Sequence, residues 1–160
     1  MTTQELKADY DAGNAGIPAG LSVGSVTPGT SQTAAFDSIV QTSAGGYSLA
    51  ISQNNNLTSG GNTIPAVAGS IASPVTWSEG STKGLGFTLY GTNATAIPGT
   101  WASGAAYAAL PGSATSFYTR SNYTGGAKDV LNMRLRLDTQ TSQVAGDYTN
   151  QMTITGTMIP

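Results

Sequence analysis

The chain has 160 residues, of which 39% are hydrophobic and only 9% are charged, with a net charge of −2. Globular domains usually carry about 25% charged residues, so Ser, Thr, Asn, Gln and Gly must solvate most of this surface. Apolar residues recur along the whole chain and the net charge is small, which excludes the composition of a disordered protein. The length suits one domain, or one domain with an added arm.

The sequence contains no Cys and no His. This excludes disulfides and the usual zinc sites, and it removes the commonest general base. With only six Lys and Arg residues, the chain is a poor candidate for binding nucleic acid. No apolar run approaches the roughly 18 residues that a membrane span needs. We therefore expect no enzymatic activity, no cofactor, no metal site, no nucleic-acid partner and no membrane span.

The first predicted element is an extended arm over residues 1–16. Its apolar residues alternate with charged ones, which predicts a strand with one apolar face. The alternative is a short helix, in which Leu6 and Tyr10 would lie one turn apart. Gly13 and Gly16 follow at once and favour the strand. The residues of the apolar face, which we expect to form a subunit interface, are Leu6, Ala8, Tyr10 and Ala12.

Residues 17–160 then read as one β domain made of short strands between turns. Leu21 and Val23 are predicted to open a strand that ends at the turn Thr27-Pro28-Gly29-Thr30, where Pro followed by Gly suits a type II turn. The stretch 57–63 is predicted to be a long polar connection, and so is most of 91–112. Further strands are predicted around residues 36–40, 47–51, 75–77, 85–89 and 117–118.

The two clearest strands lie in the last third of the chain. Leu131, Met133, Leu135 and Leu137 alternate with polar residues in one, and the other runs from Tyr148 to Met158 with Thr at alternate positions. No crossover helix is visible, which excludes a parallel α/β fold. The prediction is an all-β, immunoglobulin-like or jelly-roll β-sandwich. Its predicted core consists of Tyr47, Leu49, Ile51, Leu85, Phe87, Leu131, Met133, Leu135, Met152 and Ile154.

The acidic residues offer the main alternative to a purely structural protein. Asp129, Asp138 and Asp147 flank the two clearest strands, where they are interpreted as turn residues rather than as a catalytic pair. Asp9 and Asp11 would share one face of the arm and could hold a cation, but two solvated acids are the simpler interpretation.

Three sites match the N-glycosylation acceptor pattern, at Asn56, Asn93 and Asn122, all in predicted loops. The aromatic residues could line a sugar-binding surface, although core packing is the commoner use of such side chains. These residues are Trp77, Trp101, Tyr107, Phe117, Tyr118 and Tyr123.

The segment 142–155, Ser-Gln-Val-Ala-Gly-Asp-Tyr-Thr-Asn-Gln-Met-Thr-Ile-Thr, resembles the ending of exported bacterial surface β-sandwich proteins. Segment 21–30 is similar to the first strand of this group, and 45–49 to its Gly-Tyr-x-Leu strand. The group includes spore coat protein U-like pilins, WxL-type surface domains and related filament subunits. The chain departs from it by having no cysteines and no WxL tripeptide.

This resemblance implies an extracellular or cell-surface structural protein. Its expected role is a subunit of a pilus-like or biofilm filament that assembles with copies of itself by donor-strand complementation. The alternatives are a monomeric carbohydrate- or protein-binding surface module and a virion structural protein. No signal-peptide pattern is present, so an exported protein would be in its mature form.

Overall fold

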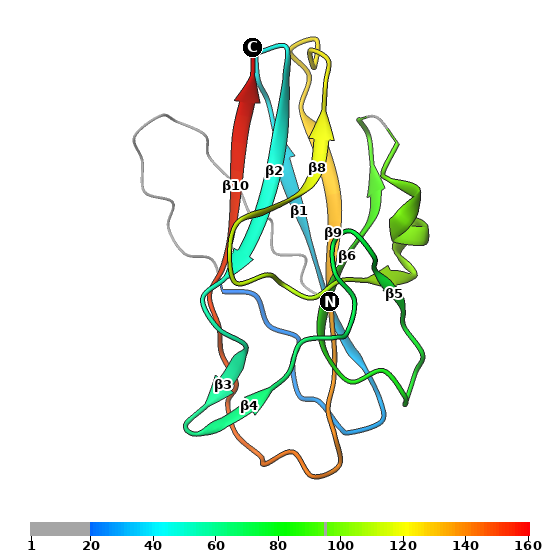
Figure 1. Ribbon diagram of the computed structural model, residues 1–160, viewed down its shortest axis with the longest axis vertical. Helices are drawn as coiled ribbons and strands as arrows, with labels where there is room; N and C mark the ends of the chain where they lie inside the picture. The colour runs from blue at the N-terminus through cyan, green and yellow to red at the C-terminus, as the bar shows by residue number, and fades with distance from the viewer. Residues whose placement is uncertain (1–19, 95) are drawn as a thin grey trace.

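The computed structural model describes residues 20–94 and 96–160, and it is an all-β fold with almost no helix (Figure 1). The predicted arm, residues 1–16, lies outside the described residues. The elements are β1 (Gln32–Val40), β2 (Gly46–Gln53), β3 (Leu57–Ser59), β4 (Asn62–Ile64), β5 (Val75–Thr76), β6 (Gly84–Thr92), the 3₁₀ helix η1 (Gly99–Gly104), β7 (Ala106–Tyr107), β8 (Thr115–Arg120), β9 (Asp129–Asp138) and β10 (Met152–Ile159).

Two three-stranded antiparallel sheets form the body of the molecule. One has the order β1-β9-β6 and the other β10-β2-β8, and Figure 1 shows the second lying in front of the first. In the first sheet Phe36 of β1 lies opposite Met133 of β9, and in the second Ile154 of β10 lies opposite Ile51 of β2. The all-β prediction is confirmed, and the arrangement is sandwich-like.

The core lies between the two sheets because alternate residues of each strand point inward. Phe87 of β6 is fully buried, with its ring centroid 5.9 Å from that of Phe117 in β8 and 5.2 Å from that of Trp101 in η1. Eight of the ten predicted core residues are buried. The prediction is wrong for Met152 and Ile154, which are only half-buried because β10 lies at the edge of its sheet.

Three sequence predictions differ from the structure near the chain's irregular regions. Leu21 and Val23 pack against the core but form no strand, although the predicted turn exists, with Gly29 at a φ of 89°. The last strand begins at Met152, so Tyr148 precedes it. The polar stretch 57–63 forms most of a hairpin, β3–β4, that the sequence did not indicate.

A buried carboxylate fastens the end of β9 to its surroundings. Asp138 is fully buried and accepts hydrogen bonds from the Lys83 ammonium at 2.8 Å and from the backbone N–H groups of Gly29 and Thr139 at 2.8 and 2.7 Å. Burial alone would raise the pKa of Asp138. The ammonium and the two N–H groups outweigh it, and the pKa lies below its ordinary value.

Removal of a central aromatic ring tests the core. Phe87→Ala should lower the free energy of unfolding by about 3–5 kcal/mol, because it leaves a cavity between the sheets and removes two ring contacts. Urea unfolding followed by tryptophan fluorescence measures the change. Val144→Ala, at a residue that is 54% exposed, is the control and should change stability by less than about 0.5 kcal/mol.

The Asp138 cluster predicts a pH dependence of stability. Because its pKa is lower in the folded than in the unfolded state, the stabilisation is complete above about pH 5 and is lost as the pH falls through the folded pKa. Asp138→Asn should cost about 3 kcal/mol at pH 7, since Lys83 loses its partner. The difference from wild type should shrink towards pH 2. An unchanged difference across this range would contradict the assignment; Asp147→Asn, at an exposed acid, is the control.

Candidate binding site along the open side of the sandwich

The two sides of the sandwich are covered unequally. On the side of β6, short bridges add Ala66 beside Leu85 and Ala108 beside Phe87, so irregular segments cover this edge. On the other side the sheets end with β10 and β1 (Figure 1). Among the described residues, no further strand extends either sheet there. The side formed by β10 and β1 is therefore the open side.

The inward apolar side chains of β10 remain partly exposed on this open side. Ile154 is half-buried, whereas Ile51, its partner in β2, is completely buried. Met158 is 38% exposed, whereas its partner Tyr47 is completely buried. Paired residues share one face of a sheet, so the exposure reflects the missing cover at the edge. Met152, Ile154 and Met158 thus form a partly exposed apolar edge along β10.

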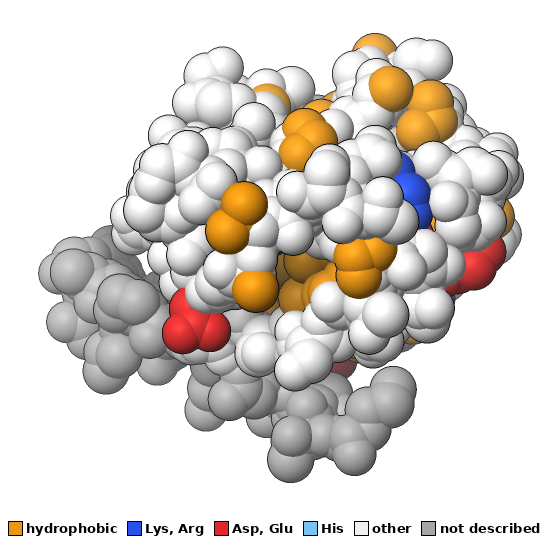
Figure 2. Space-filling view, turned by 90° about the horizontal axis from the view of Figure 1, so that it is seen from below, with side chains coloured by type: hydrophobic (Ala, Val, Ile, Leu, Met, Phe, Trp, Pro, Cys, Tyr) orange, Lys and Arg blue, Asp and Glu red, His pale blue; other side chains and the backbone are white. Residues whose placement is uncertain are grey.

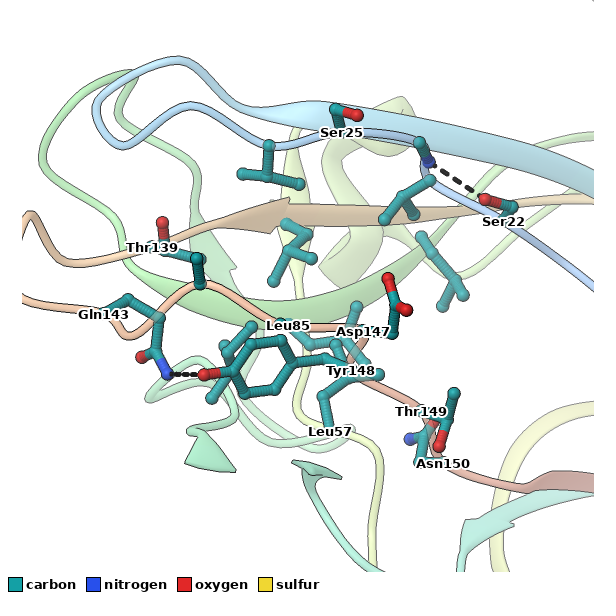
Figure 3. Close-up of a pocket in the computed structure, with 18 of the residues that line it drawn as sticks. Ser22, Ser25, Leu57, Leu85, Thr139, Gln143, Asp147, Tyr148, Thr149 and Asn150 are labelled. Carbon is teal, nitrogen blue, oxygen red and sulfur yellow. Dashed lines mark hydrogen bonds between the residues drawn. The ribbon is translucent and has the colours of Figure 1, made fainter. Parts of the chain in front are cut away.

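A cavity of about 830 Å³ lies at the lower end of the molecule as drawn in Figure 1, and Figure 3 shows it in close-up. Viewed from below, the surface is hollowed and apolar side chains show in its depth (Figure 2). The cavity lies between segment 21–28 and segment 139–150 and extends to β6 and β9 of one large sheet and to the β3–β4 hairpin. Its apolar lining consists of Leu21, Val23, Val26, Pro28, Leu57, Ile64, Leu85, Leu135, Leu137, Val144, Ala145 and Tyr148.

Polar contacts hold the mouth of the cavity in shape. The Tyr148 hydroxyl accepts a hydrogen bond from Gln143 Nε2 at 2.6 Å and donates one to the Val144 carbonyl at 2.7 Å. Backbone bonds between Thr58 and Thr149, 3.0 Å each way, tie this segment to the β3–β4 hairpin. Residues 143–150 of the segment that carries the family resemblance line this wall, and β10 begins shortly after them at Met152.

The predicted interface residues Leu6, Ala8, Tyr10 and Ala12 lie outside the described residues. Gly20 is the first described residue, and Leu21 lines the cavity together with Thr149 and Asn150, which lie shortly before β10 in the sequence. The described chain therefore begins at the wall of the cavity that also holds the segment leading into β10.

The three acids proposed as a catalytic alternative do not converge. Asp129 and Asp138 stand at opposite ends of β9, about 30 Å apart for a ten-residue strand, and Asp147 is exposed at the cavity mouth. Asp129 instead accepts a hydrogen bond from the Tyr47 hydroxyl at 2.9 Å and forms an ion pair with Arg120. Burial, and then this bond to Asp129, raise the pKa of Tyr47. In the described part of the chain, no cluster of three or more acids could hold a metal ion.

Partners that the sequence did not indicate also surround the arginines of β9. Arg136 forms an ion pair with Glu79 and lies 4.9 Å above the Trp77 ring. The N–H and hydroxyl of Ser31, followed by Arg136, lower the pKa of Glu79. Arg134 lies 4.8 Å above the Tyr90 ring. These contacts fix the outer face of the β1-β9-β6 sheet.

The aromatic and glycosylation candidates differ in their exposure and hydrogen bonding. Tyr123 is 52% exposed, and the other five aromatic candidates are buried. The Asn93 side chain bridges the Val130 N–H and the Lys128 carbonyl, so both ends of its amide are engaged. Asn56 accepts a hydrogen bond from Gln53, and Asn122 is exposed on the loop before β9.

No helix among residues 20–94 and 96–160 is long and apolar enough to cross a membrane. Comparison of the chain with protein-family models, with curated proteins and with solved structures finds no match. The proposed function therefore depends on the motifs of the sequence and on the geometry of the apolar edge of β10 and of the cavity.

Proposed function

We propose that this protein is a structural, non-enzymatic subunit of an extracellular filament, either pilus-like or a biofilm fibre. Subunits join by strand addition, in which residues 1–16 of one copy lie along the open side of the next. The side chains that face the apolar edge of β10 are Leu6, Ala8, Tyr10 and Ala12. In this proposal the sandwich is of the immunoglobulin-like or jelly-roll kind, and the protein is secreted and acts at the cell surface.

The single observation that carries the proposal is the partial exposure of Met152, Ile154 and Met158 on the inward face of β10. An apolar edge of this kind invites an added strand, whose alternate side chains would complete the core. The predicted arm has the required alternation, and Leu6 and Tyr10 would each gain about 1.5–3 kcal/mol from full burial, before ordering costs.

The dimensions of the arm suit this role. β10 has eight residues and spans about 27 Å, which an extended stretch of similar length within residues 1–12 can match. Residues 13–19 then connect the arm to Gly20, and Gly13 and Gly16 give this connection conformational freedom. Such a connection also permits the arm to pack along the apolar edge of its own domain. This would give a monomeric binding module instead of a filament.

Deletion of residues 1–12 tests strand addition. The truncated protein should remain folded but form no filaments in negative-stain micrographs, and a free peptide of residues 1–16 should bind it and raise its Tm. Filaments identical to those of the full chain would contradict the proposal. Full-length protein that stays monomeric at all concentrations would instead favour the self-folded arm.

A matched pair of variants separates the two faces of the arm. Leu6→Ser with Tyr10→Ser removes the apolar face and should abolish filaments. Lys7→Ser with Asp9→Ser changes the opposite face and should leave them intact. Equal effects of the two pairs would show that the apolar face is not what binds.

A further inference from the structure

We propose that the two ends of the domain form a second contact between copies, independent of the arm. The loop of residues 121–128 of one copy docks at the cavity mouth of the next, with Tyr123 in the cavity and Lys128 facing Asp147. This inference rests on the proposed function, because it supposes that copies meet end to end in a filament.

The docking loop is stiff and carries an exposed aromatic residue. Two consecutive glycines, Gly125 and Gly126, take φ values of 71° and 77° at its bend. Side chains from several elements hold its carbonyls, including Arg120 on the carbonyls of Asn122 and Tyr123 at 3.0 and 3.2 Å. Tyr123 is nevertheless 52% exposed. A fixed, exposed tyrosine loses little entropy when it binds, which is typical of an anchor residue.

Further bonds fasten the rest of this loop to the body of the domain. The Thr124 hydroxyl donates to the Thr42 carbonyl at 3.0 Å, Gln41 Nε2 donates to the Gly126 carbonyl at 2.8 Å, and Asn93 Nδ2 donates to the Lys128 carbonyl at 3.1 Å. The loop is therefore presented in one shape, as preorganised binding requires.

The receiving surface is the cavity mouth at the other end. Val144 lines it and is 54% exposed, so Val144 and Tyr123 are the two most exposed large hydrophobic residues of the described chain. A cavity of about 830 Å³ has ample room for a tyrosine side chain. An exposed apolar projection at one end thus matches an open apolar hollow at the other.

The two surfaces cannot meet within one copy. Loop 121–128 directly precedes β9, and the cavity wall 139–150 follows it, so the ten residues of β9 separate them by about 30 Å (Figure 1). A contact between different surfaces of identical copies extends into an open chain unless its rotation closes a ring. This is the geometry that a filament needs.

Charge supports the same pairing. The ion pairs Arg120–Asp129 near the loop and Lys83–Asp138 and Arg136–Glu79 near the cavity neutralise their members. Lys128 and Asp147 are exposed and belong to none of these pairs. In the described part of the chain, Lys128 thus adds a positive charge at one end and Asp147 a negative charge at the other, and docking brings the two together.

End-to-end docking also agrees with strand addition. Leu21 lines the cavity, so the arm leaves from the end that receives the neighbour's loop. That loop lies at the same end of the neighbour as the last residues of β10 (Figure 1). The arm would therefore reach the neighbour's apolar edge at this end and run parallel to the neighbour's β10. An arm that packs along the apolar edge of its own domain would instead run antiparallel to β10.

Cysteine cross-linking tests the contact directly, because the chain has no cysteine of its own. The full-length double variant Tyr123→Cys with Val144→Cys, under mild oxidation, should give a ladder of disulfide-linked dimers, trimers and larger species on a non-reducing gel. Each single variant should give no species beyond a dimer. Ser113→Cys with Val144→Cys, which uses another exposed position, is the matched control and should give no ladder.

Charge reversal provides a second measurement on the same double-cysteine chain. Lys128→Asp or Asp147→Lys alone should lower the yield of the ladder several-fold, and the two together should restore it. No ladder, or equal ladders from the control pair, would overturn the contact, and so would charge reversals without effect. Cross-linking of Tyr10→Cys to Val144→Cys in place of the ladder would show that an arm fills the cavity, and would also overturn it.

The outcomes keep this contact separate from the proposed function. Filaments that persist without a ladder overturn end docking and leave strand addition intact. A ladder from protein that forms no filaments in micrographs supports end docking and contradicts the filament role.

Discussion

The need to cover both inner faces of two small sheets governs this structure. Within residues 20–94 and 96–160 each large sheet has three strands, so β2 and β9 are the strands with a full strand on both sides. Tyr47, Leu49 and Ile51 of β2 are completely or almost completely buried, whereas the inward residues of β10 are not. A three-stranded sheet cannot bury its edge strand from within, and the cover must come from elsewhere. Loops and η1 provide it beside β6, and on the β10 side the described chain leaves it incomplete.

Polar groups fix the ends of the sandwich, where apolar packing is weakest. At one end Asp129 joins β9 to β2 and β8 through Tyr47 and Arg120, and at the other Asp138 joins β9 to Lys83 and to the turn at Gly29. Both acids belong to the same strand, so β9 is tied across the molecule at each end. Buried carboxylates with several donors resist sliding of one sheet over the other, because any shift would leave a charge without partners.

The sequence predicted the regular part of the fold well because alternation reports directly on burial. In β2 and β9, alternate apolar residues gave both the strand and its inward face. Alternation fails where one face of a strand-like segment is not covered by a sheet: Leu21 and Val23 line a cavity instead of pairing. It also assigned Met152 and Ile154 to the core, because side-chain pattern cannot tell an edge strand from a middle one. The order of strands and the cavity depend on contacts between distant parts of the chain. The contacts of Asp129 with Tyr47 and of Asp138 with Lys83 and Gly29 likewise join residues 55 to 109 apart in sequence, which no local pattern encodes.

Incomplete cover and unlike ends together determine what copies of this domain can do to one another. An open apolar edge alone would favour pairing of like with like, β10 against β10, and such pairs close after two copies. In the proposed assembly, an arm that leaves the domain near Leu21 would break this symmetry, because it would reach outward from a single end. The exposed Tyr123 at the other end breaks it again. In the proposed filament, each copy would therefore be added in the same orientation as the last. Growth in one dimension would then follow from the placement of the two proposed contact surfaces at opposite ends of β9.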